Sequence, residues 1–409
     1  GKEENVLVVQ ADNSDQPNSR WYSGSGIYRN VWLVKTGQVH VDNWGTNITT
    51  PVMNADKSTV EIETTLKNEA SDVTVEVSTL IQDKEGKTLY RISSPVEIAA
   101  GGKKTVTHTI EMFYPELWSV RNPYLYTAIT EVRVGNKLTD RYRTTFGIRK
   151  FDWDEHTGFS LNGEPTKILG VCLHHDLGCL GSAVNPRALE RQLQIMKDMG
   201  ANAVRTSHNP PAPELLDICD RIGLLVQDEA FDMWRKRKSP YDYARYFDEW
   251  HEKDLTDQVL RDRNHPSLLI WTPTNEEFWP DRVQYPRLMH DLYNLTKMID
   301  PTRPFHGASG GTHIATDIWT VHNYEQDPAK LKEKLYNGGK LMEAPKWEIH
   351  LMPMNIGYNG LKYTDQYAFP EYKTLFSFFH KQACFNLFVF WQFAQILWDL
   401  ALVSPVYSW

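Results

Sequence analysis

The 409-residue sequence predicts a multidomain β plus α/β protein, in which antiparallel β structure precedes a (β/α)8 barrel of the TIM type. Three observations lead to this fold class. Residues 37–146 alternate apolar and polar side chains with period two, as half-buried strands do. From about residue 147, short apolar runs alternate with helical segments, the order of a parallel sheet covered by helices. The length also exceeds what one ordinary core organises, so two or three domains are expected.

Residues 1–36 contain two short apolar runs, Asn5–Val9 and Ile27–Val34, with a polar segment between them. These runs predict the last strands of a β domain whose earlier strands lie upstream. The N-terminus, Gly1–Glu4, is polar, shows no signal peptide and leads directly into the first run. We therefore expect the chain to be an N-terminally truncated part of a longer protein.

Residues 37–146 are predicted to form an immunoglobulin-like β-sandwich. The period-two pattern is clear in Thr59–Leu66, Val73–Val77 and Thr105–Ile110, with turn residues such as Ala100–Gly102 between the runs. About 110 residues of short strands at this spacing match the size of such a sandwich. Titratable residues do not cluster in this part of the sequence, so a structural role is expected for it.

Residues 147–409 are predicted to form the barrel. The expected strands are Ile168–Cys172, Asn202–Thr206, Leu224–Asp228, Ser267–Trp271, Phe305–Ala308, Asp317–Val321, Ile349–Met354 and Asn386–Trp391. The expected helices are Pro186–Met199, Ala212–Ile222, 243–263, Val283–Met298, Pro328–Tyr336 and Asp365–Ala383. Eight strands with helices between most of them give the count of a (β/α)8 barrel.

Polar side chains gather where these strands end. Ser267–Trp271 is apolar throughout, as a strand buried on both faces is, and Asn275 and Glu276 follow it. The other polar or aromatic strand ends are His174–Asp176, Arg205–Pro210, Asp228–Glu229, His322–Tyr324 and Trp391. The carboxyl ends of barrel strands meet on one face, where barrel enzymes hold their chemistry. We interpret the set as a site for a polyhydroxylated ligand.

Composition narrows the class of partner. The net charge is −8 and the sequence has no block dense in Lys and Arg, which argues against nucleic acid. It contains no uninterrupted apolar run of about 18 residues, so a membrane span is not expected. The four cysteines form no CxxC pair and indicate neither a zinc site nor a disulfide framework. Localisation in the cytoplasm, the periplasm or outside the cell is left open, as is assembly into a homo-oligomer.

Three ordered motifs resemble glycoside hydrolase family 2, the family of β-galactosidases, β-glucuronidases and β-mannosidases. They are Gly170–Asp176, Asn202–His208, and Asp262–Ser267 continuing to Asn275 and Glu276. Upstream, Ser19–Trp32 resembles the end of the family's N-terminal jelly-roll sugar-binding domain, and Leu117–Tyr126 the end of its sandwich. The resemblance therefore implies a jelly-roll remnant over 1–36, an immunoglobulin-like domain over 37–146 and a catalytic barrel over 147–409. It is closest to β-galactosidases.

The resemblance implies a retaining exo-β-glycosidase that hydrolyses terminal β-D-galactosides by double displacement. Such enzymes use two carboxyl groups, one as acid/base and one as nucleophile. The matched positions are Glu276 as acid/base, Asn275 toward the sugar 2-hydroxyl, His174 and His208 toward other hydroxyls, Tyr324 beside the nucleophile, Trp391 under the ring and Arg205 as support for the nucleophile. A β-glucuronidase of the same family is the alternative reading.

The sequence departs from the family at the nucleophile. The expected Glu at the end of strand seven falls on Asn355, in Met352–Gly360. An amide cannot form the glycosyl ester, so a catalytically impaired carbohydrate-binding relative is a further alternative. Glu371 and Glu348 are other carboxylates nearby, and Asn355 fits the spacing better. The identity of the true nucleophile is left open. The reliability of the sequence over about the last 70 residues is left open as well.

No cofactor is certain. Some relatives bind a divalent cation, for example Mg²⁺, beside the acid/base through acids that follow strand three. Asp228, Glu229 and Asp232 are the candidates here, although their spacing fits that pattern poorly and favours structural acids. The expected partner is a small or oligosaccharide β-glycoside substrate.

Overall fold

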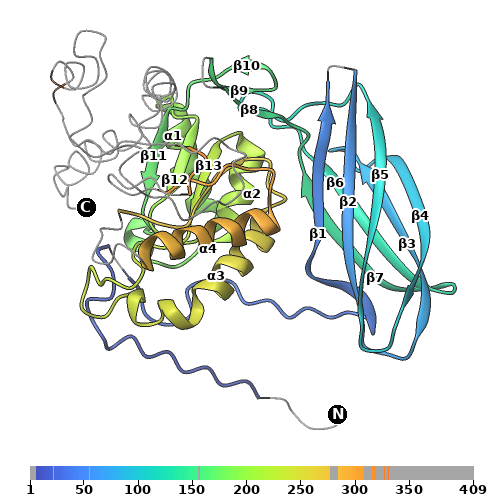
Figure 1. Ribbon diagram of the computed structural model, residues 1–409, viewed down its shortest axis with the longest axis horizontal. Coiled ribbons are helices and arrows are strands. Elements are labelled where there is room, and N and C mark those ends of the chain that lie inside the picture. Colours follow the sequence, from blue (N-terminus) through green and yellow to red (C-terminus); the bar gives the residue numbers. More distant parts are fainter. Residues whose placement is uncertain are drawn as a thin grey trace, which may run out of the picture.

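The computed structural model describes residues 6–21, 23–54, 56–154, 157–276, 284–307, 315–318, 327 and 330. Within these ranges the chain forms a β-sandwich, a short linking sheet and the first strands of a parallel barrel, arranged as Figure 1 shows. No helix among the described residues is long and apolar enough to cross a membrane.

The sandwich consists of two antiparallel sheets. One sheet has the order β1 (Val39–Met53), β2 (Lys57–Asn68) and β5 (Lys103–Phe113). The other has the order β4 (Thr88–Ile98), β3 (Val73–Gln82), β6 (Tyr126–Val134) and β7 (Lys137–Phe146). In β2 every second residue is buried, because one face of the strand packs on the opposite sheet and the other faces outward.

A small antiparallel sheet joins the sandwich to the barrel. It contains β8 (Phe151–Asp154), β9 (Gly158–Leu161) and β10 (Glu164–Pro165). Trp118 is fully buried beside this sheet, and its indole Nε1 donates to the carbonyl of Asp220 at 2.8 Å. Gly223 follows the last residue of the helix Pro213–Ile222 and has φ +76. A Cβ at this position would lie 2.4 Å from the carbonyl oxygen of Val120. Sandwich and barrel are therefore packed at backbone contact.

Four parallel strands lie side by side in the order β11 (Gly170–Leu173), β12 (Ala203–Thr206), β13 (Leu225–Glu229) and β14 (Leu268–Thr272). Isolated bridges from Trp271 to Phe305 and from His306 to Ile318 continue the parallel arrangement. All residues of β12, β13 and β14 are buried, and for β14 the apolar run Ser267–Trp271 predicts this. The described strands thus form the first part of a TIM barrel.

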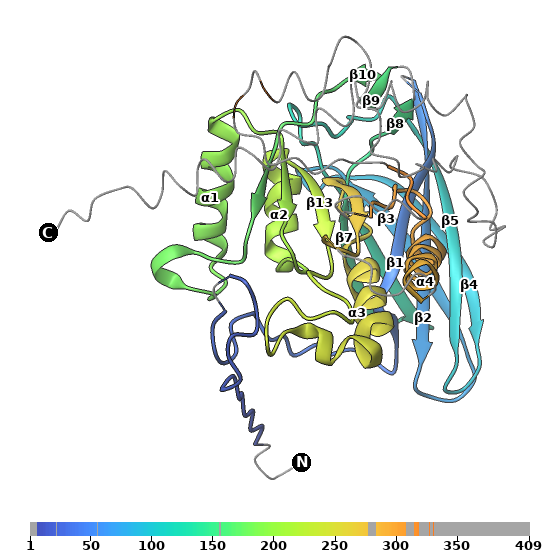
Figure 2. The same ribbon diagram turned by 60° about the vertical axis from the view of Figure 1, so that its left-hand side comes forward.

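Helices follow each of the four strands, as Figure 2 shows from the side. They are α1 (Pro186–Asp198), α2 (Pro213–Ile222), α3 (Phe247–Asp262) and α4 (Gln284–Ile299), with short 3-10 turns η1 (Gly178–Leu180) and η2 (Tyr243–Arg245). Local signals set the helix starts: the Asn185 side chain accepts a hydrogen bond from the Ala188 amide, and Pro186 fills the first helical position.

The first segment of the chain differs from expectation. Among its described residues, 6–21 and 23–36, no strand or helix forms, although two strands were predicted there. Val6–Val9 and Val31–Val34 are exposed, and an apolar run without a neighbouring strand cannot pair its backbone groups. The segment instead runs along the loops that follow the barrel strands, where Tyr241 donates its amide to the Pro17 carbonyl.

Candidate functional site

The carboxyl ends of β12, β13 and β14 meet in a buried charged network. Arg205 of β12 lies between the other two strand ends and is almost fully buried. Its guanidinium Nε bonds a carboxylate oxygen of Glu229 in β13, and its Nη2 donates to the Asn275 Oδ1 at 2.9 Å. Parallel strands in register deliver their last side chains to the same edge, which is why three distant sequence positions touch here.

Glu229 and His208 form a second part of the network. His208 Nδ1 lies 2.5 Å from Glu229 Oε1. Burial raises the pKa of Glu229 to about 7, although Arg205 beside it acts in the opposite direction. Burial also lowers the pKa of His208 well below its ordinary value, with the Arg205 charge adding to the effect. The imidazole is therefore neutral at pH 7, and its other nitrogen is free of the Glu229 contact.

Asn275 is held at both ends of its amide. Its Oδ1 accepts from Arg205, and its Nδ2 donates to Asp232 Oδ1 at 2.8 Å. Glu276 follows directly with φ +46, a left-handed conformation that is uncommon for a residue other than glycine. Such backbone geometry costs energy and is found preferentially at functional sites.

The aromatic rings of Trp21 and His174 lie beside His208 in the site. The ring centroids of Trp21 and His174 are 5.6 Å apart, and those of Trp21 and His208 are 5.9 Å apart. His174 Nδ1 is buried and has no hydrogen-bond partner among the described residues. Burial lowers the pKa of His174, so this nitrogen belongs to a neutral ring with an unused hydrogen-bonding atom.

A cavity of about 340 Å³ adjoins the network. It is lined by Trp21, His208 and Asp232, by the sandwich residue Trp44 and by residues of α3. Asn275 and Glu276 are not among its lining residues. The volume is large enough for a sugar ring, and the aromatic walls give it the character of a ligand pocket.

The structure brings together Asn275, His174, His208 and Arg205 of the predicted site, and Glu276 follows Asn275 in the chain. Asn355, Tyr324 and Trp391 lie outside the described residues. Sequence reasoning missed three members of the network: Arg20, Trp21 and Lys238. The conspicuous Ser19–Trp21 stretch was the signal for two of them. Lys238 had no signal, since a lysine in a polar loop is usually solvated.

The acids proposed for a divalent cation are already engaged. Glu229 binds Arg205 and His208, and Asp232 contacts Arg20 and Lys238. Burial, with the Asp262 charge adding to it, raises the pKa of Asp228 well above its ordinary value, and its Oδ1 already accepts from Gln258. A metal would have to displace the protein groups that bond these acids, so these residues do not fit a metal site.

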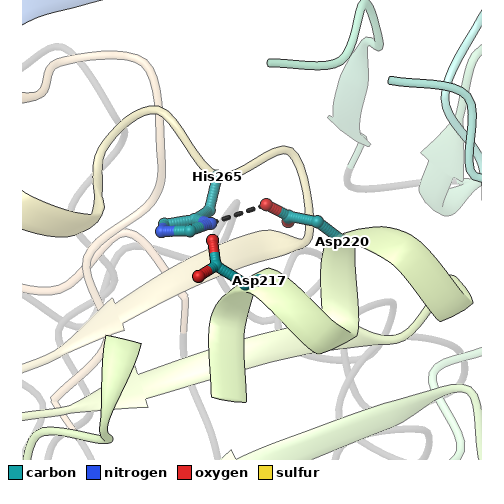
Figure 3. A group of neighbouring side chains, drawn as sticks. All are labelled: Asp217, Asp220 and His265. Atoms are coloured by element: carbon teal, nitrogen blue, oxygen red, sulfur yellow. Dashed lines mark hydrogen bonds and ion pairs between the residues drawn. The ribbon is translucent and has the colours of Figure 1, made fainter. Parts of the chain in front are cut away.

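Another acid and histidine group lies at the opposite end of the sheet. Asp217, Asp220 and His265, drawn in Figure 3, have potential ligand atoms within 4.8 Å of one another. His265 Nδ1 bonds Asp220 at 2.6 Å. Burial alone would lower the pKa of His265, but the Asp220 charge and hydrogen bond raise it to about 9. A protonated imidazole has no lone pair for a metal, so we assign a structural ion pair.

A parallel barrel whose strand ends carry carboxylates, an oriented amide, neutral imidazoles and an aromatic wall defines a TIM-barrel protein with a site suited to carbohydrate. The family model described as "Glycosyl hydrolases family 2, TIM barrel domain" matches residues 155–384, and "Glycosyl hydrolases family 2" matches residues 39–149. The chain belongs to glycoside hydrolase family 2.

Individual relatives agree with this assignment. The chain is 55% identical to the β-galactosidase BoGH2A of Bacteroides ovatus over 282 residues, which are 68% of this chain and 33% of that protein. It is 28% identical to a β-glucuronidase of Bacteroides fragilis over 346 residues, 79% of this chain and 48% of that protein. A solved family 2 member from Bacteroides cellulosilyticus superposes with TM-score 0.73 at 39% identity, covering 76% of this chain and 42% of the other. The chain thus spans less than half the length of these three relatives.

Proposed function

We propose that the protein is a retaining exo-β-glycosidase acting on terminal β-D-galactosides, with Glu276 as its acid/base. One observation carries the proposal: Asn275 and Glu276 lie three and four positions after the last residue of β14, and Arg205 and Asp232 fix the Asn275 amide from both sides. An amide held in this way cannot rotate to suit solvent. In the proposed function, this fixed amide would offer its hydrogen bond to the ligand in one orientation, as a preorganised site requires.

In this mechanism Glu276 first donates its proton to the glycosidic oxygen as the bond to the aglycone breaks. It later removes a proton from the water that releases the sugar. Asn275 would hydrogen-bond the sugar 2-hydroxyl, a contact that strengthens in the transition state. His174 and His208, with neutral rings, would bind other hydroxyls, and Trp21 would cover an apolar face of the sugar.

The galactoside is favoured over the glucuronide by the 55% identity to a β-galactosidase, against 38% and 37% to two relatives described as β-glucuronidases. None of these identities decides the substrate, because named relatives of both kinds belong to the family. We keep Tyr324 and Trp391 as substrate-contacting residues in the proposal, and the division of the chain at about residues 36 and 146.

A second candidate, a carbohydrate-binding relative that does not turn over substrate, is favoured by one observation. Position 355, where the family nucleophile is expected, is Asn. The amide is a poor nucleophile and cannot give the covalent glycosyl ester on which retaining hydrolysis depends.

Aryl β-D-galactoside and aryl β-D-glucuronide, assayed side by side, test both candidates. Release from the galactoside by the native chain supports the first. If the native chain is inactive but Asn355→Glu gains galactosidase activity and the native chain binds galactose, the second is correct. If neither form releases either aryl group and neither binds galactose, both candidates are wrong.

A further inference from the structure

A residue far upstream of the barrel enters the site. Arg20 lies outside both ranges matched by the family models, 39–149 and 155–384. Its side chain nevertheless reaches Asp232, which follows β13 and is 212 positions away in sequence. Arg20 Nε donates to Asp232 Oδ2 at 3.0 Å, and Nη2 donates to Oδ1 at 2.5 Å. This is the two-pronged geometry in which arginine binds a carboxylate most specifically.

Asp232 connects this contact to the amide at the end of β14. The Asp232 side chain is only 2% exposed, and its Oδ1 accepts from Asn275 Nδ2 at 2.8 Å. Lys238 also approaches Oδ1, at 3.3 Å. Among the described residues, Oδ2 receives a hydrogen bond from Arg20 alone. The plane of the carboxylate, and with it the direction of Oδ1, is therefore set by the arginine.

Charge supports the same assignment. A buried carboxylate without partners would lose its solvation and take up a proton. Burial does act in this direction on Asp232, but the hydrogen bond from Arg20 and the charge of Lys238 outweigh it, and the pKa is lowered overall. The acceptor that Asn275 faces thus stays ionised and does not become a hydroxyl donor.

We propose that Arg20 is a positioning residue, which acts through Asp232 to hold the Asn275 amide ready for the 2-hydroxyl of the sugar. The proposal rests on the proposed function, since the role of Asn275 comes from there. If the proposal is correct, the segment before the sandwich is part of the site. Arg20 then affects the recognition of one group of the ligand, the sugar 2-hydroxyl.

Lys238 cannot replace Arg20 in this role. Its ammonium group also bonds the backbone carbonyls of Asp232 and Asn275, so it holds the loops. Moreover, an ammonium is a single point charge and cannot fix both oxygens of a carboxylate as the guanidinium fork does. An Arg20→Lys variant therefore keeps the charge near Asp232 and loses the control of its plane.

A simpler role for Arg20 would be to hold the first segment against the barrel without acting on the site. Another ion pair joins the same two parts of the chain and provides a matched control variant. Asp15, five positions earlier, bonds Arg245 at 2.6 Å, and this pair makes no contact with Asp232 or Asn275. Asp15→Asn removes an ion pair between the same two parts of the chain without touching the site.

Binding of D-galactose and of 2-deoxy-D-galactose to the whole chain, titrated calorimetrically or by ligand-observed NMR, separates these roles without requiring turnover. We expect the native chain to prefer galactose, and Arg20→Met to weaken galactose about fivefold, the size of one hydrogen bond, while leaving 2-deoxygalactose unchanged. Asn275→Ala should behave in the same way, Arg20→Lys should lie between, and Asp15→Asn should match the native chain.

The outcomes are distinguishable. If the native chain binds neither sugar, or binds both equally, the proposed function or the role of Asn275 within it is wrong, and the inference falls with it. If the native chain prefers galactose but Arg20→Met weakens both sugars equally, or Asp15→Asn has the same effect, Arg20 is only a tie and the proposed function stands. Circular dichroism identifies a misfolded Arg20→Met variant. In that case Arg20→Lys decides, through its ratio of galactose affinity to 2-deoxygalactose affinity.

Discussion

The two ends of the parallel sheet carry two buried ionic networks that differ in what they leave unbound. At the amino end, Asp220 accepts from His265 and from the Ser267 amide, and Arg303 donates to the carbonyls of Leu268 and His265. These charges are bonded to the backbone that enters β14. At the carboxyl end, the network of Arg205, Glu229 and Asn275 lies beside His174, whose Nδ1 has no partner among the described residues.

The comparison indicates that the two ends of the parallel sheet have different roles, one in stability and the other in ligand binding and catalysis. Charges at the amino end neutralise one another and fix the loops that start the strands. Charges at the carboxyl end fix side chains, and one buried imidazole nitrogen beside them is left without a hydrogen bond among the described residues. In TIM barrels, the first end generally serves stability and the second serves function. Changes at one end should therefore affect sugar turnover or binding, and changes at the other end should affect unfolding.

The largest expected effect is at the carboxyl end. Glu276→Gln keeps the shape of the side chain but removes the proton that the leaving oxygen needs. We expect kcat on an aryl β-galactoside with a poor leaving group to fall about 10²–10⁴-fold, the usual contribution of a general acid. The measurement is made in the native chain and, if that is inactive, in Asn355→Glu.

The unfolding temperature of Glu276→Gln should stay close to that of its parent, because the change neither opens a cavity nor breaks the Arg205 network. A variant with full activity, or one that loses stability in proportion to activity, would contradict the division between the two ends. An activated leaving group, which needs less protonation, should lose much less rate and serves as the internal comparison.

The next effect is at the amino end. Asp220→Ala leaves the His265 charge without its partner and the Ser267 amide without its acceptor. Breaking a buried pair in this way costs about 3 kcal/mol, which should lower the unfolding temperature by several degrees. Thermal unfolding followed by circular dichroism measures it. Galactose affinity at temperatures where the variant is folded should equal that of the native chain, and weakened binding would show that the two ends are coupled.

The pH dependence of unfolding tests the same ion pair. The pKa of His265 is about 9 in the folded chain and near 6.5 when unfolded. A raised histidine pKa stabilises the fold fully below pH 6.5, and the contribution is lost as pH rises through 9. We expect the native chain to lose about 3 kcal/mol more than His265→Asn between pH 6.5 and 9.5. Parallel pH curves for the two proteins would show that His265 does not carry this charge.

Much of the barrel was predictable, because its local signals agree with its packing. Ser267–Trp271 was predicted as a buried strand from its apolar run, and β14 occupies Leu268–Thr272 with all residues buried. Arg205, His208 and Asn275 were also found from sequence, since parallel strands deliver their ends to one edge. The contact between Arg20 and Asp232 was not, because no local pattern encodes a pairing across 212 positions.

The strands predicted near Asn5–Val9 and Ile27–Val34 were wrong for a related reason. Apolar alternation indicates which residues could line a sheet, and a strand forms only where a partner supplies backbone hydrogen bonds. Glu229 and Asp232 were considered only as metal ligands or structural acids. Their position in the site depends on Arg205 and Arg20, which reach them from other elements.

The smallest expected effect concerns Asp217, the outer member of the group at the amino end. Asp217 is exposed, and the hydrogen bonds of this group are made by Asp220. Asp217→Asn should therefore change the free energy of unfolding by less than about 0.5 kcal/mol, as is usual for a surface substitution. Adding Mg²⁺, Ca²⁺ or Zn²⁺ should raise the unfolding temperature of neither form, because a protonated His265 cannot bind metal. If a metal ion raises the unfolding temperature of the native chain and Asp217→Asn abolishes that rise, the group at the amino end is a metal site and not a structural ion pair.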